Sequence, residues 1–520
     1  MAALDKPKAQ ANKFAILKAT VLIIGGIASL ILIFNPTSFE YPPGLGRAAF
    51  VSLGILILAI VLWITEYMHS AFVGFICCVA IYTLGNFMGE SKLVSGAFAG
   101  FMSASVWHVF GGLLLGCGIM RSGISRRLFI KLLSIGKGSY SGLVALVMLA
   151  GVILLFLLPS TDGRTILLIS VLLGMKGIDV RSSAAEVFSK PKKSFFGRKT
   201  NDKPPDEAHL AKQAESDSRP LKGIFIMIPV STSVLGIGVL SSASAILCQG
   251  MIQTHMGITV SYLDWIIYYL PASIAIIFFC YWMAAKFYKC PIDMKNLSDS
   301  AREENKKLPP MSPNEIRVLI IFSLAISLWI GGSFFNLRPD IVAMGCSSLL
   351  LIPKIGFLKK KDLMEDLNWL IAPLFLGSAL SIVETMNSTG MLPYIGNIVF
   401  GGMLSSDGST PILVTMIMIC LIATFLHVFS ARSTVLVASF LPLLLAWSVP
   451  QGLGLFVPLT FLWGAQVQFM AYQSGAITAA YGYGEFNTPE LLKSTVPLGI
   501  FMVFVGPVIL YFWWLLIGLV

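Results

Sequence analysis

Charged side chains are scarce in this sequence. Only 12% of its 520 residues are Asp, Glu, Lys or Arg, against about 25% in a soluble globular domain. Hydrophobic residues make up 56% of the chain, and apolar runs of about 20 residues, long enough to cross a bilayer, recur along its length. The composition therefore excludes a large soluble domain and predicts an all-α polytopic membrane protein.

Recognisable motifs for metals, disulfides and nucleic acids are also lacking. The eight cysteines mostly lie within apolar runs, and no CxxC or Cys/His spacing indicates zinc or a disulfide framework. The net charge of +11 comes from a few hydrophilic loops, as expected of cytoplasmic loops. We expect no cofactor, no metal and no nucleic-acid partner. An intramembrane enzyme would need an acidic cluster that is absent, so we expect a carrier rather than an enzyme or a channel.

The apolar runs fall into two similar halves behind a first span. We expect a cytoplasmic N-terminus over 1–16, a first span over 17–34 and a first repeat over 45–286. A cytoplasmic linker, a charged loop over 287–316, then leads to a second repeat over 317–520. The first repeat includes a Lys-rich cytoplasmic loop over 176–222. An odd number of spans per repeat predicts that the halves are inverted relative to each other. The C-terminus is then expected on the outer side.

Two long apolar segments are interrupted by short polar stretches. Residues 139–175 contain PSTDGRT, and residues 409–448 contain SARST. The first segment is too long for one span, and its second arm, of about ten residues, is too short to cross alone. Irregular backbone within a bilayer is tolerated only beside protein or a water-filled cavity. We therefore predict two re-entrant hairpins with polar tips near mid-membrane. Breaks in 236–245 and 471–480 interrupt the following spans.

The hairpin tips carry isolated charges. Arg432 is the only fixed charge over 408–484, and Asp162 and Arg164 are the only ones over 138–175. Arginine at the centre of a bilayer costs about 2.5–3.5 kcal/mol on insertion scales, so two such residues at corresponding places indicate a shared role. A guanidinium suits a carboxylate, sulfonate or phosphate. We expect both arginines to converge on one anion site; the alternative is internal pairing or snorkelling.

Polar side chains of the tips and the broken spans complete the candidate site. The predicted substrate-binding residues are Ser160, Thr161, Arg164, Thr165, Ser430, Arg432, Ser433, Thr434, Ser241, Ser242, Gln473 and Ser474. Asp162 and His427 are candidate proton sites, because histidine changes charge near neutral pH. The alternative for His427 is a neutral, hydrogen-bonded core histidine.

Several segments resemble the divalent anion/sodium symporters. WITE (63–66) is similar to the W-x-T-E that ends the family's second span. Four further stretches are also similar to the family: 97–128, 260–274, 474–500 and 511–518. The resemblance implies eleven transmembrane helices plus two re-entrant hairpins in a homodimer whose transport domains move like elevators against a scaffold. It also implies di- or tricarboxylates, or sulfate, as substrates, in a multi-pass cell-membrane protein.

The tips depart from the family pattern of Ser-Asn-Thr. Both keep the serine and lose the next two residues: Thr161 and Asp162 follow Ser160, and Ala431 and Arg432 follow Ser430. Our hypothesis is that a fixed guanidinium takes the place of a bound sodium ion. The sequence then predicts a sodium-independent secondary carrier of di- or tricarboxylates, working by exchange or proton coupling. The alternatives are a sodium-coupled symporter with remodelled sites and a carrier of sulfonate- or sulfate-type anions.

Overall fold

The computed structural model is helical wherever it is regular. It describes residues 6–34, 41–65, 67–136, 138–158, 160–175, 222–240, 242–288, 295–332, 335, 337–365, 367–401, 410–430 and 432–520, and within these ranges it contains no β-strand. The cytoplasmic loop expected before residue 222 lies outside the described residues. The all-α class predicted from composition is confirmed.

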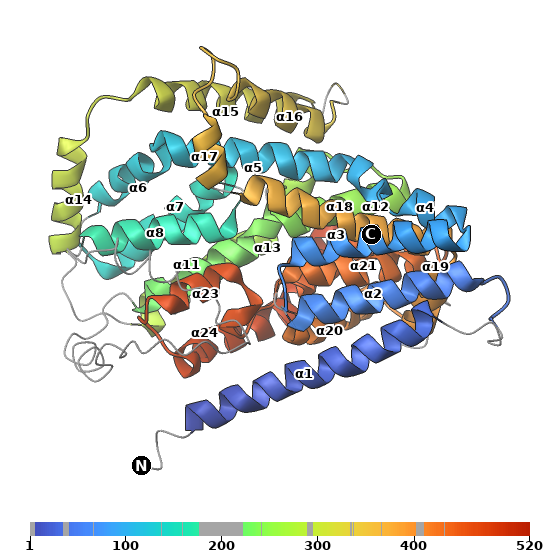
Figure 1. The fold of residues 1–520 in the computed structure, drawn as a ribbon. Helices are drawn as coiled ribbons and strands as arrows, with labels where there is room; N and C mark the ends of the chain where they lie inside the picture. The colour runs from blue at the N-terminus through green and yellow to red at the C-terminus, as the bar shows by residue number, and fades with distance from the viewer. Residues whose placement is uncertain are drawn as a thin grey trace, which may run out of the picture.

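Helix α1 (Lys6–Ile33) lies along one edge of the molecule and packs on α2 (Figure 1). The first half then forms a series of spans, a hairpin, a broken helix and a final long helix. Its elements are α2 (Arg47–Thr65), α3 (Ser70–Met88), α4 (Ser91–Gly96), η1 (Ala99–Met102), α5 (Ala104–Ser122), α6 (Ile124–Ser134), α7 (Tyr140–Leu157), α8 (Thr161–Met175), α11 (Lys222–Leu235), η2 (Gly236–Gly238), α12 (Ala243–Met256), α13 (Tyr262–Trp282) and η3 (Met283–Phe287).

The second half repeats this order of elements. After a connecting helix come a span and a shorter helix, then a long helix, a short helix, a hairpin and a broken helix, in the order of the first half. The elements are α14 (Lys295–Lys307), α15 (Pro313–Gly332), α16 (Pro339–Leu349), α17 (Lys360–Glu365), α18 (Asn368–Ser388), α19 (Met391–Phe400), α20 (Ile412–Phe429), α21 (Ser433–Ser448), α22 (Phe456–Gly464), η4 (Ala471–Gln473), α23 (Gly475–Gly482), α24 (Thr488–Ile500), η5 (Phe501–Val505) and α25 (Gly506–Leu516).

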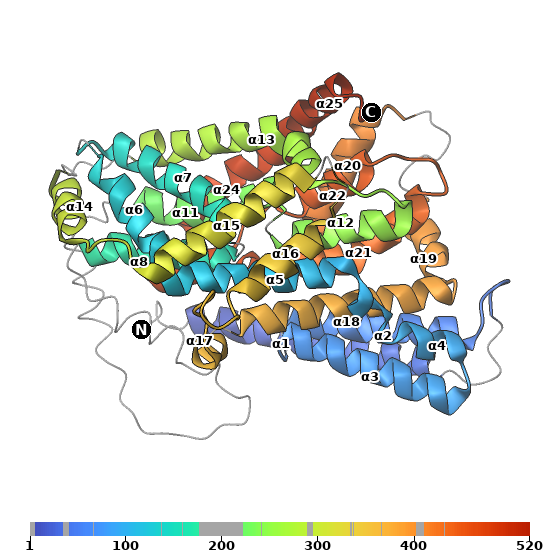
Figure 2. The same cartoon turned by 90° about the horizontal axis from the view of Figure 1, so that it is seen from above.

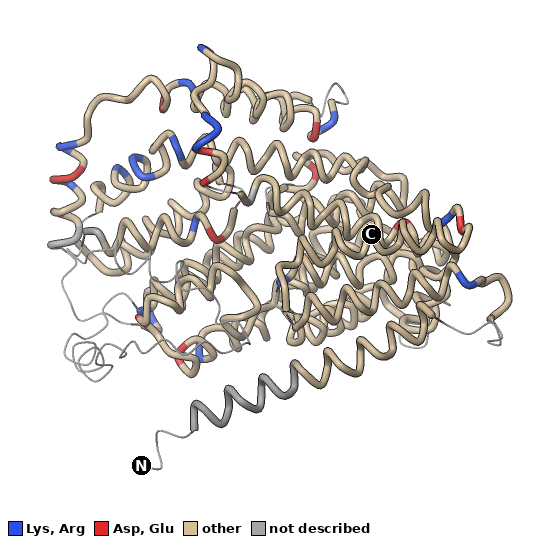
Figure 3. The backbone as a smooth tube through the Cα atoms, in the orientation of Figure 1, with Lys and Arg blue, Asp and Glu red and all other residues tan. Residues whose placement is uncertain are grey.

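Nine helices in the described ranges are long and apolar enough to cross a membrane. One arm of each expected hairpin, Tyr140–Phe156 and Ser433–Ser448, belongs instead to the shorter apolar helices. Lysine and arginine gather where α5, α6, α14 and α17 meet, while the middle of the molecule carries few charges (Figure 3). This separation is what a bilayer requires of a spanning protein, and it confirms a polytopic membrane protein.

Both hairpins break at the polar stretches found in the sequence. Helix α7 ends at Leu157 and α8 begins at Thr161, where the Ser160 hydroxyl accepts a hydrogen bond from the Gly163 amide at 3.1 Å. Because this serine caps the helix inside the polar stretch, α8 is 15 residues long, longer than the arm expected from hydropathy. Helix α20 ends at Phe429 and α21 begins at Ser433, where no side chain caps the start of the helix.

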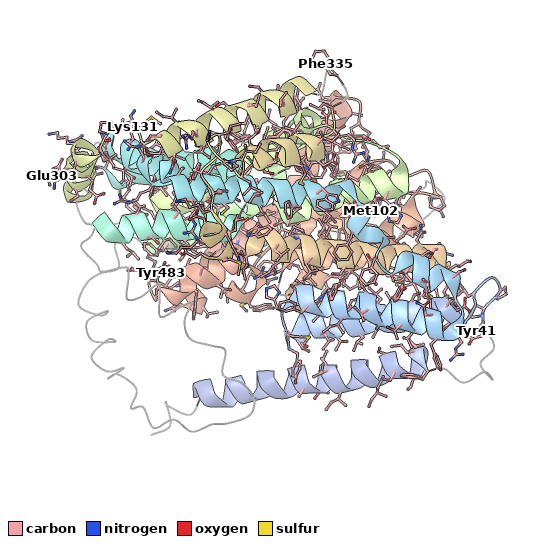
Figure 4. All side chains as sticks on the ribbon, turned by 45° about the horizontal axis from the view of Figure 1, so that its top comes forward. Tyr41, Met102, Lys131, Glu303, Phe335 and Tyr483 are labelled. Carbon is pink, nitrogen blue, oxygen red and sulfur yellow. The ribbon has the colours of Figure 1, made fainter. Side chains whose placement is uncertain are left out.

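The connection between the halves differs from the charged loop expected over 287–316. It contains helix α14, which packs on α6, with Arg126 Nη2 3.2 Å from Glu304 Oε2. Glu303 of α14 and Lys131 of α6 lie at one end of the molecule, away from Tyr41 and Met102 (Figure 4). Charge alone does not indicate a loop here, since a highly charged segment can form a helix that packs on a neighbouring helix, as α14 does on α6.

Candidate anion-binding site

A cavity of about 200 Å³ lies where the two hairpins meet the two broken helices. Its lining includes residues 160–162 at the first tip, 432–434 at the second, and 242–244 and 473–475 at the breaks. Helices α8, α12, α21 and α23 each begin at one of these stretches, and Figure 2 shows α12 and α21 lying side by side. Four segments far apart in sequence therefore converge on one space.

The cavity is built from helix N-termini. The first turns of four helices leave backbone N–H groups without intrahelical partners, and each helix carries a partial positive charge at that end. Ser242 caps α12, accepting from the Ala245 amide at 3.3 Å, while Ser474 precedes α23 without forming a side-chain cap. Such an arrangement favours an anion without requiring a bound metal.

The two halves contribute to the cavity by crossing over. Helix α8 packs against α23, and α21 packs against α12, so the second arm of each hairpin lies beside the broken helix of the opposite half. The contact between α8 and α23 is close: a Cβ added to Gly475 would lie 2.4 Å from Asp162 Oδ2. Glycine at this position lets the carboxylate lie against the start of α23.

Arg432 lines the cavity with an exposed side chain. It precedes the first residue of α21 in an extended conformation, and its backbone oxygen accepts a hydrogen bond from the Ser430 hydroxyl at 3.0 Å. Within the described part of the chain its guanidinium forms no ion pair or hydrogen bond. The full donor fork is therefore available to an anion in the cavity.

Arg164 does not line this cavity. Its side chain is 0% exposed, and Nη1 donates to the Leu158 carbonyl. Nη2 donates to Thr161 Oγ1 at 3.2 Å and to the Thr232 carbonyl at 3.1 Å. The guanidinium thus connects the first hairpin tip to helix α11 just before its break. The expectation that both arginines touch one bound anion does not match this position.

The predicted residues other than Arg164 fall into three groups. Those that line the cavity are Ser160, Thr161, Asp162, Ser242, Arg432, Ser433, Thr434, Gln473 and Ser474. Thr165, Ser430 and His427 are buried outside the lining. Thr165 Oγ1 lies 3.0 Å from Thr232 Oγ1, and Ser241 lies outside the described residues.

His427 is buried at the end of α20, where it bridges to the second broken helix. Its Nδ1 donates to the Val467 carbonyl at 2.9 Å, and its own carbonyl accepts from Gln473 Nε2 at 2.9 Å. Nε2 has no hydrogen-bond partner among the described residues. Its position matches the interpretation of a hydrogen-bonded core histidine more closely than a cavity-facing proton site.

Sequence reasoning missed several polar residues of the lining. Gln468 Nε2 donates to Ser233 Oγ at 2.8 Å, and Gln466 Nε2 donates to Ser244 Oγ at 3.0 Å. All four side chains line the cavity. The signal was present in the sequence, since Gln466 and Gln468 are two amide side chains inside an otherwise apolar run. Among the described residues, no group of His, Cys, Asp or Glu could hold a metal ion.

Comparison with known proteins gives the chain a family. The sequence model described as the sodium:sulfate symporter transmembrane region matches residues 17–520. A membrane protein of Cupriavidus necator is 22% identical over 506 residues, covering 92% of this chain and 89% of that protein. The L-tartrate/succinate antiporter of Escherichia coli K12 is 24% identical over 371 residues, covering 69% and 67%.

These matches confirm the resemblance to the divalent anion/sodium symporters that the sequence indicated. A family described as a transmembrane region agrees with the all-helical fold and its candidate membrane spans. The chain belongs to the sodium:sulfate symporter family and is a multi-pass membrane transporter of small anions, not an enzyme.

Proposed function

We propose that this transporter exchanges dicarboxylates across the plasma membrane without sodium. A related chain is named L-tartrate/succinate antiporter, which supports both a four-carbon diacid and exchange. Arg432 and the helix N-termini at the cavity supply the positive groups that a carboxylate needs. Tricarboxylates and sulfonate- or sulfate-type anions are the next candidates, because the guanidinium fork also fits their oxygens.

The position of Arg164 is the observation that supports sodium-independent transport most directly. Its buried guanidinium contacts two carbonyl oxygens and one hydroxyl oxygen, from Leu158, Thr232 and Thr161. Oxygen atoms of this kind, at broken helices, are what coordinate sodium in secondary transporters. A side-chain cation fixed among them supplies the same positive charge behind the substrate site permanently. No ion then has to bind from solution with each substrate.

The second half has a comparable arrangement without a fixed charge. There the His427 imidazole donates to the Val467 carbonyl, and Gln473 ties the same helix end to the break. In each half, a side-chain donor forms a hydrogen bond to a backbone carbonyl near the broken helix. The alternative of a sodium-coupled symporter requires these donors to move aside, or sodium to use other carbonyl oxygens.

Proton coupling is the second candidate mechanism. A proton that moves with the substrate needs a titratable group facing the cavity, and Asp162 has that position. Uptake driven by an imposed pH gradient, and lost in Asp162→Asn, would favour this mechanism. Uptake driven equally by a preloaded dicarboxylate, without a gradient, would favour exchange.

The remaining features of the proposal follow the family resemblance. We infer a homodimer in which hairpins and broken helices move as a transport domain against a scaffold. The N-terminus would lie in the cytoplasm, on the side where lysine and arginine gather, and the C-terminus outside. Light scattering on the purified protein tests the dimer, and cysteine labelling of each terminus in intact cells tests the orientation.

The direct experiment is uptake of labelled succinate by purified protein in liposomes. Empty and succinate-loaded vesicles would be compared with sodium or potassium as the only external cation. Uptake that is raised by internal succinate and equal in both salts supports the proposal. Uptake that requires sodium overturns sodium independence, whereas absence of transport with every dicarboxylate and tricarboxylate overturns the substrate class.

A further inference from the structure

Asp162 places a negatively charged carboxylate in the cavity that we propose binds an anion. It lies in the first turn of α8 at the first hairpin tip, and it lines the same cavity as Arg432. Within the described residues its carboxylate accepts no hydrogen bond and joins no ion pair. A partly buried carboxylate without donors is costly, so a donor from the substrate would stabilise it.

The two charges of the cavity also limit what can bind there. Arg432 and Asp162 both line the space, and neither is paired with the other. An anionic group placed at Arg432 gains charge-assisted hydrogen bonds. A second anionic group placed at Asp162 would instead meet a like charge, which is unfavourable in a site of low dielectric.

Other groups near Asp162 do not remove this restriction. The Arg164 guanidinium is directed to backbone carbonyls and is 0% exposed, so it offers no donor to the cavity. The amide groups of Gln466 and Gln468 donate to serine hydroxyls. Asp162 is attracted by the nearby Arg164 charge, but no described side chain donates a hydrogen bond to its carboxylate. A donor on the molecule in the cavity would supply that hydrogen bond.

We propose that the substrate is an acid that carries a hydrogen-bond donor, a hydroxyl or an ammonium group, which binds Asp162 while a carboxylate binds Arg432. This inference rests on the proposed function and narrows its substrate class to hydroxy- or amino-substituted acids. Asp162 acts as a specificity residue: it selects against a plain diacid, which offers only acceptors at neutral pH.

The test uses three four-carbon diacids that differ in one substituent. Succinate has hydrogen at the second carbon, malate has a hydroxyl and aspartate has an ammonium group. Each would compete with labelled malate for exchange into proteoliposomes containing the full-length protein at pH 7. The variants are Asp162→Ala, which removes the acceptor, and Asp162→Asn, which keeps a neutral acceptor. Asp299→Asn is the matched control, since Asp299 is half exposed on α14 and pairs with Arg302.

The wild-type protein is expected to prefer malate or aspartate over succinate by about tenfold or more, the effect of one hydrogen bond to a charged group. Asp162→Ala should remove that preference, so that the three acids compete equally, and Asp299→Asn should behave as wild type. Retention of part of the malate preference in Asp162→Asn identifies the hydroxyl as the donor. Selective loss of aspartate identifies the ammonium group.

Two results would overturn the inference. One is a wild-type protein that binds succinate as well as the substituted acids, and the other is an Asp162→Ala variant that weakens all three equally. If no acid is exchanged, the proposed function fails separately. The donor preference is then read from the shift in unfolding temperature that each acid causes in the purified protein, and an equal shift with all three contradicts it.

Discussion

The two arginines of the hairpin tips differ in the hydrogen-bond partners of their guanidinium groups. Arg432 stands just before α21, exposed at the cavity, and its guanidinium is available to a ligand. Arg164 lies within α8 and its guanidinium is committed to backbone carbonyls. The first is therefore suited to contact a moving anion, and the second to supply a fixed charge.

Replacing Arg432 tests the first role. We expect Arg432→Ala to raise KM for the exchanged acid by about tenfold to a hundredfold, since a hydrogen bond to a charged group is worth about 1.5–3 kcal/mol. The KM of Arg432→Lys should lie between that of the wild type and that of Arg432→Ala, because lysine keeps the charge and loses the planar fork. Unfolding temperature should not change, because the side chain is exposed. An unaltered KM in Arg432→Ala would contradict a contact with substrate.

Substitution of Gly475 tests whether the Asp162 carboxylate lies against the start of α23. A Cβ there would lie 2.4 Å from Asp162 Oδ2, so Gly475→Ala should displace the carboxylate from the start of α23. We expect the preference for acids with a donor to fall by about tenfold, as for loss of one charged hydrogen bond. Gly345→Ala is the control, because its Cβ would have nothing within 4 Å. Wild-type substrate preference in Gly475→Ala would argue against the observed contact.

Which tip residues face the cavity could be predicted only after the start of the helix was known. Asp162 and Arg164 are two positions apart, which in an α-helix is about 200° around the axis. They therefore cannot both face one cavity, and the capping by Ser160 that starts α8 at Thr161 decides this. Hydropathy located the polar stretch but gave no helix boundary within it.

At the scale of elements, the sequence predicted the interrupted segments better than the connections. Both hairpins and both broken helices occur where small and polar residues interrupt apolar runs. The linker was expected as a loop because it is highly charged, yet KNLSDSAREENKK forms α14. Its stabilising partners lie on α6, more than a hundred residues earlier, so the local sequence could not reveal them.

The connection between α6 and the second half depends on Arg127. Its Nε and Nη2 lie 2.6 and 3.2 Å from the two oxygens of Glu315, whose side chain is 6% exposed. Arg127→Gln should lower stability by about 1–3 kcal/mol, because the Glu315 carboxylate loses its charged partner and keeps the Ser312 amide as a donor at 2.7 Å. Thermal unfolding of the purified protein measures this.

A matched pair on the same surface provides the control for Arg127. Arg126 and Glu304 are both well exposed, so Arg126→Gln should change stability by less than about 1 kcal/mol. The double variant Arg127→Gln with Glu315→Gln should recover part of the loss, because it removes the unpaired charge. Equal effects of Arg126→Gln and Arg127→Gln would show that burial of the pair is not what matters.

At the scale of the whole molecule, the site exists only because the two halves cross over. The second arm of each hairpin packs on the broken helix of the other half, so neither half alone closes the cavity. This arrangement brings four helix N-termini to one cavity. The repeated order of interrupted segments indicated such a meeting point, but not which hairpin arm would meet which broken helix.

The central claim is that Arg164 provides permanently the charge that sodium provides elsewhere. The most direct measurement is exchange of labelled malate by proteoliposomes in sodium or in potassium. It compares the wild type with Arg164→Ser, and size-exclusion chromatography checks the folded fraction of each protein. The account predicts equal exchange in both salts for the wild type, and loss of exchange in potassium for the variant. Wild-type exchange that requires sodium, or a folded variant that exchanges normally in potassium, would contradict it.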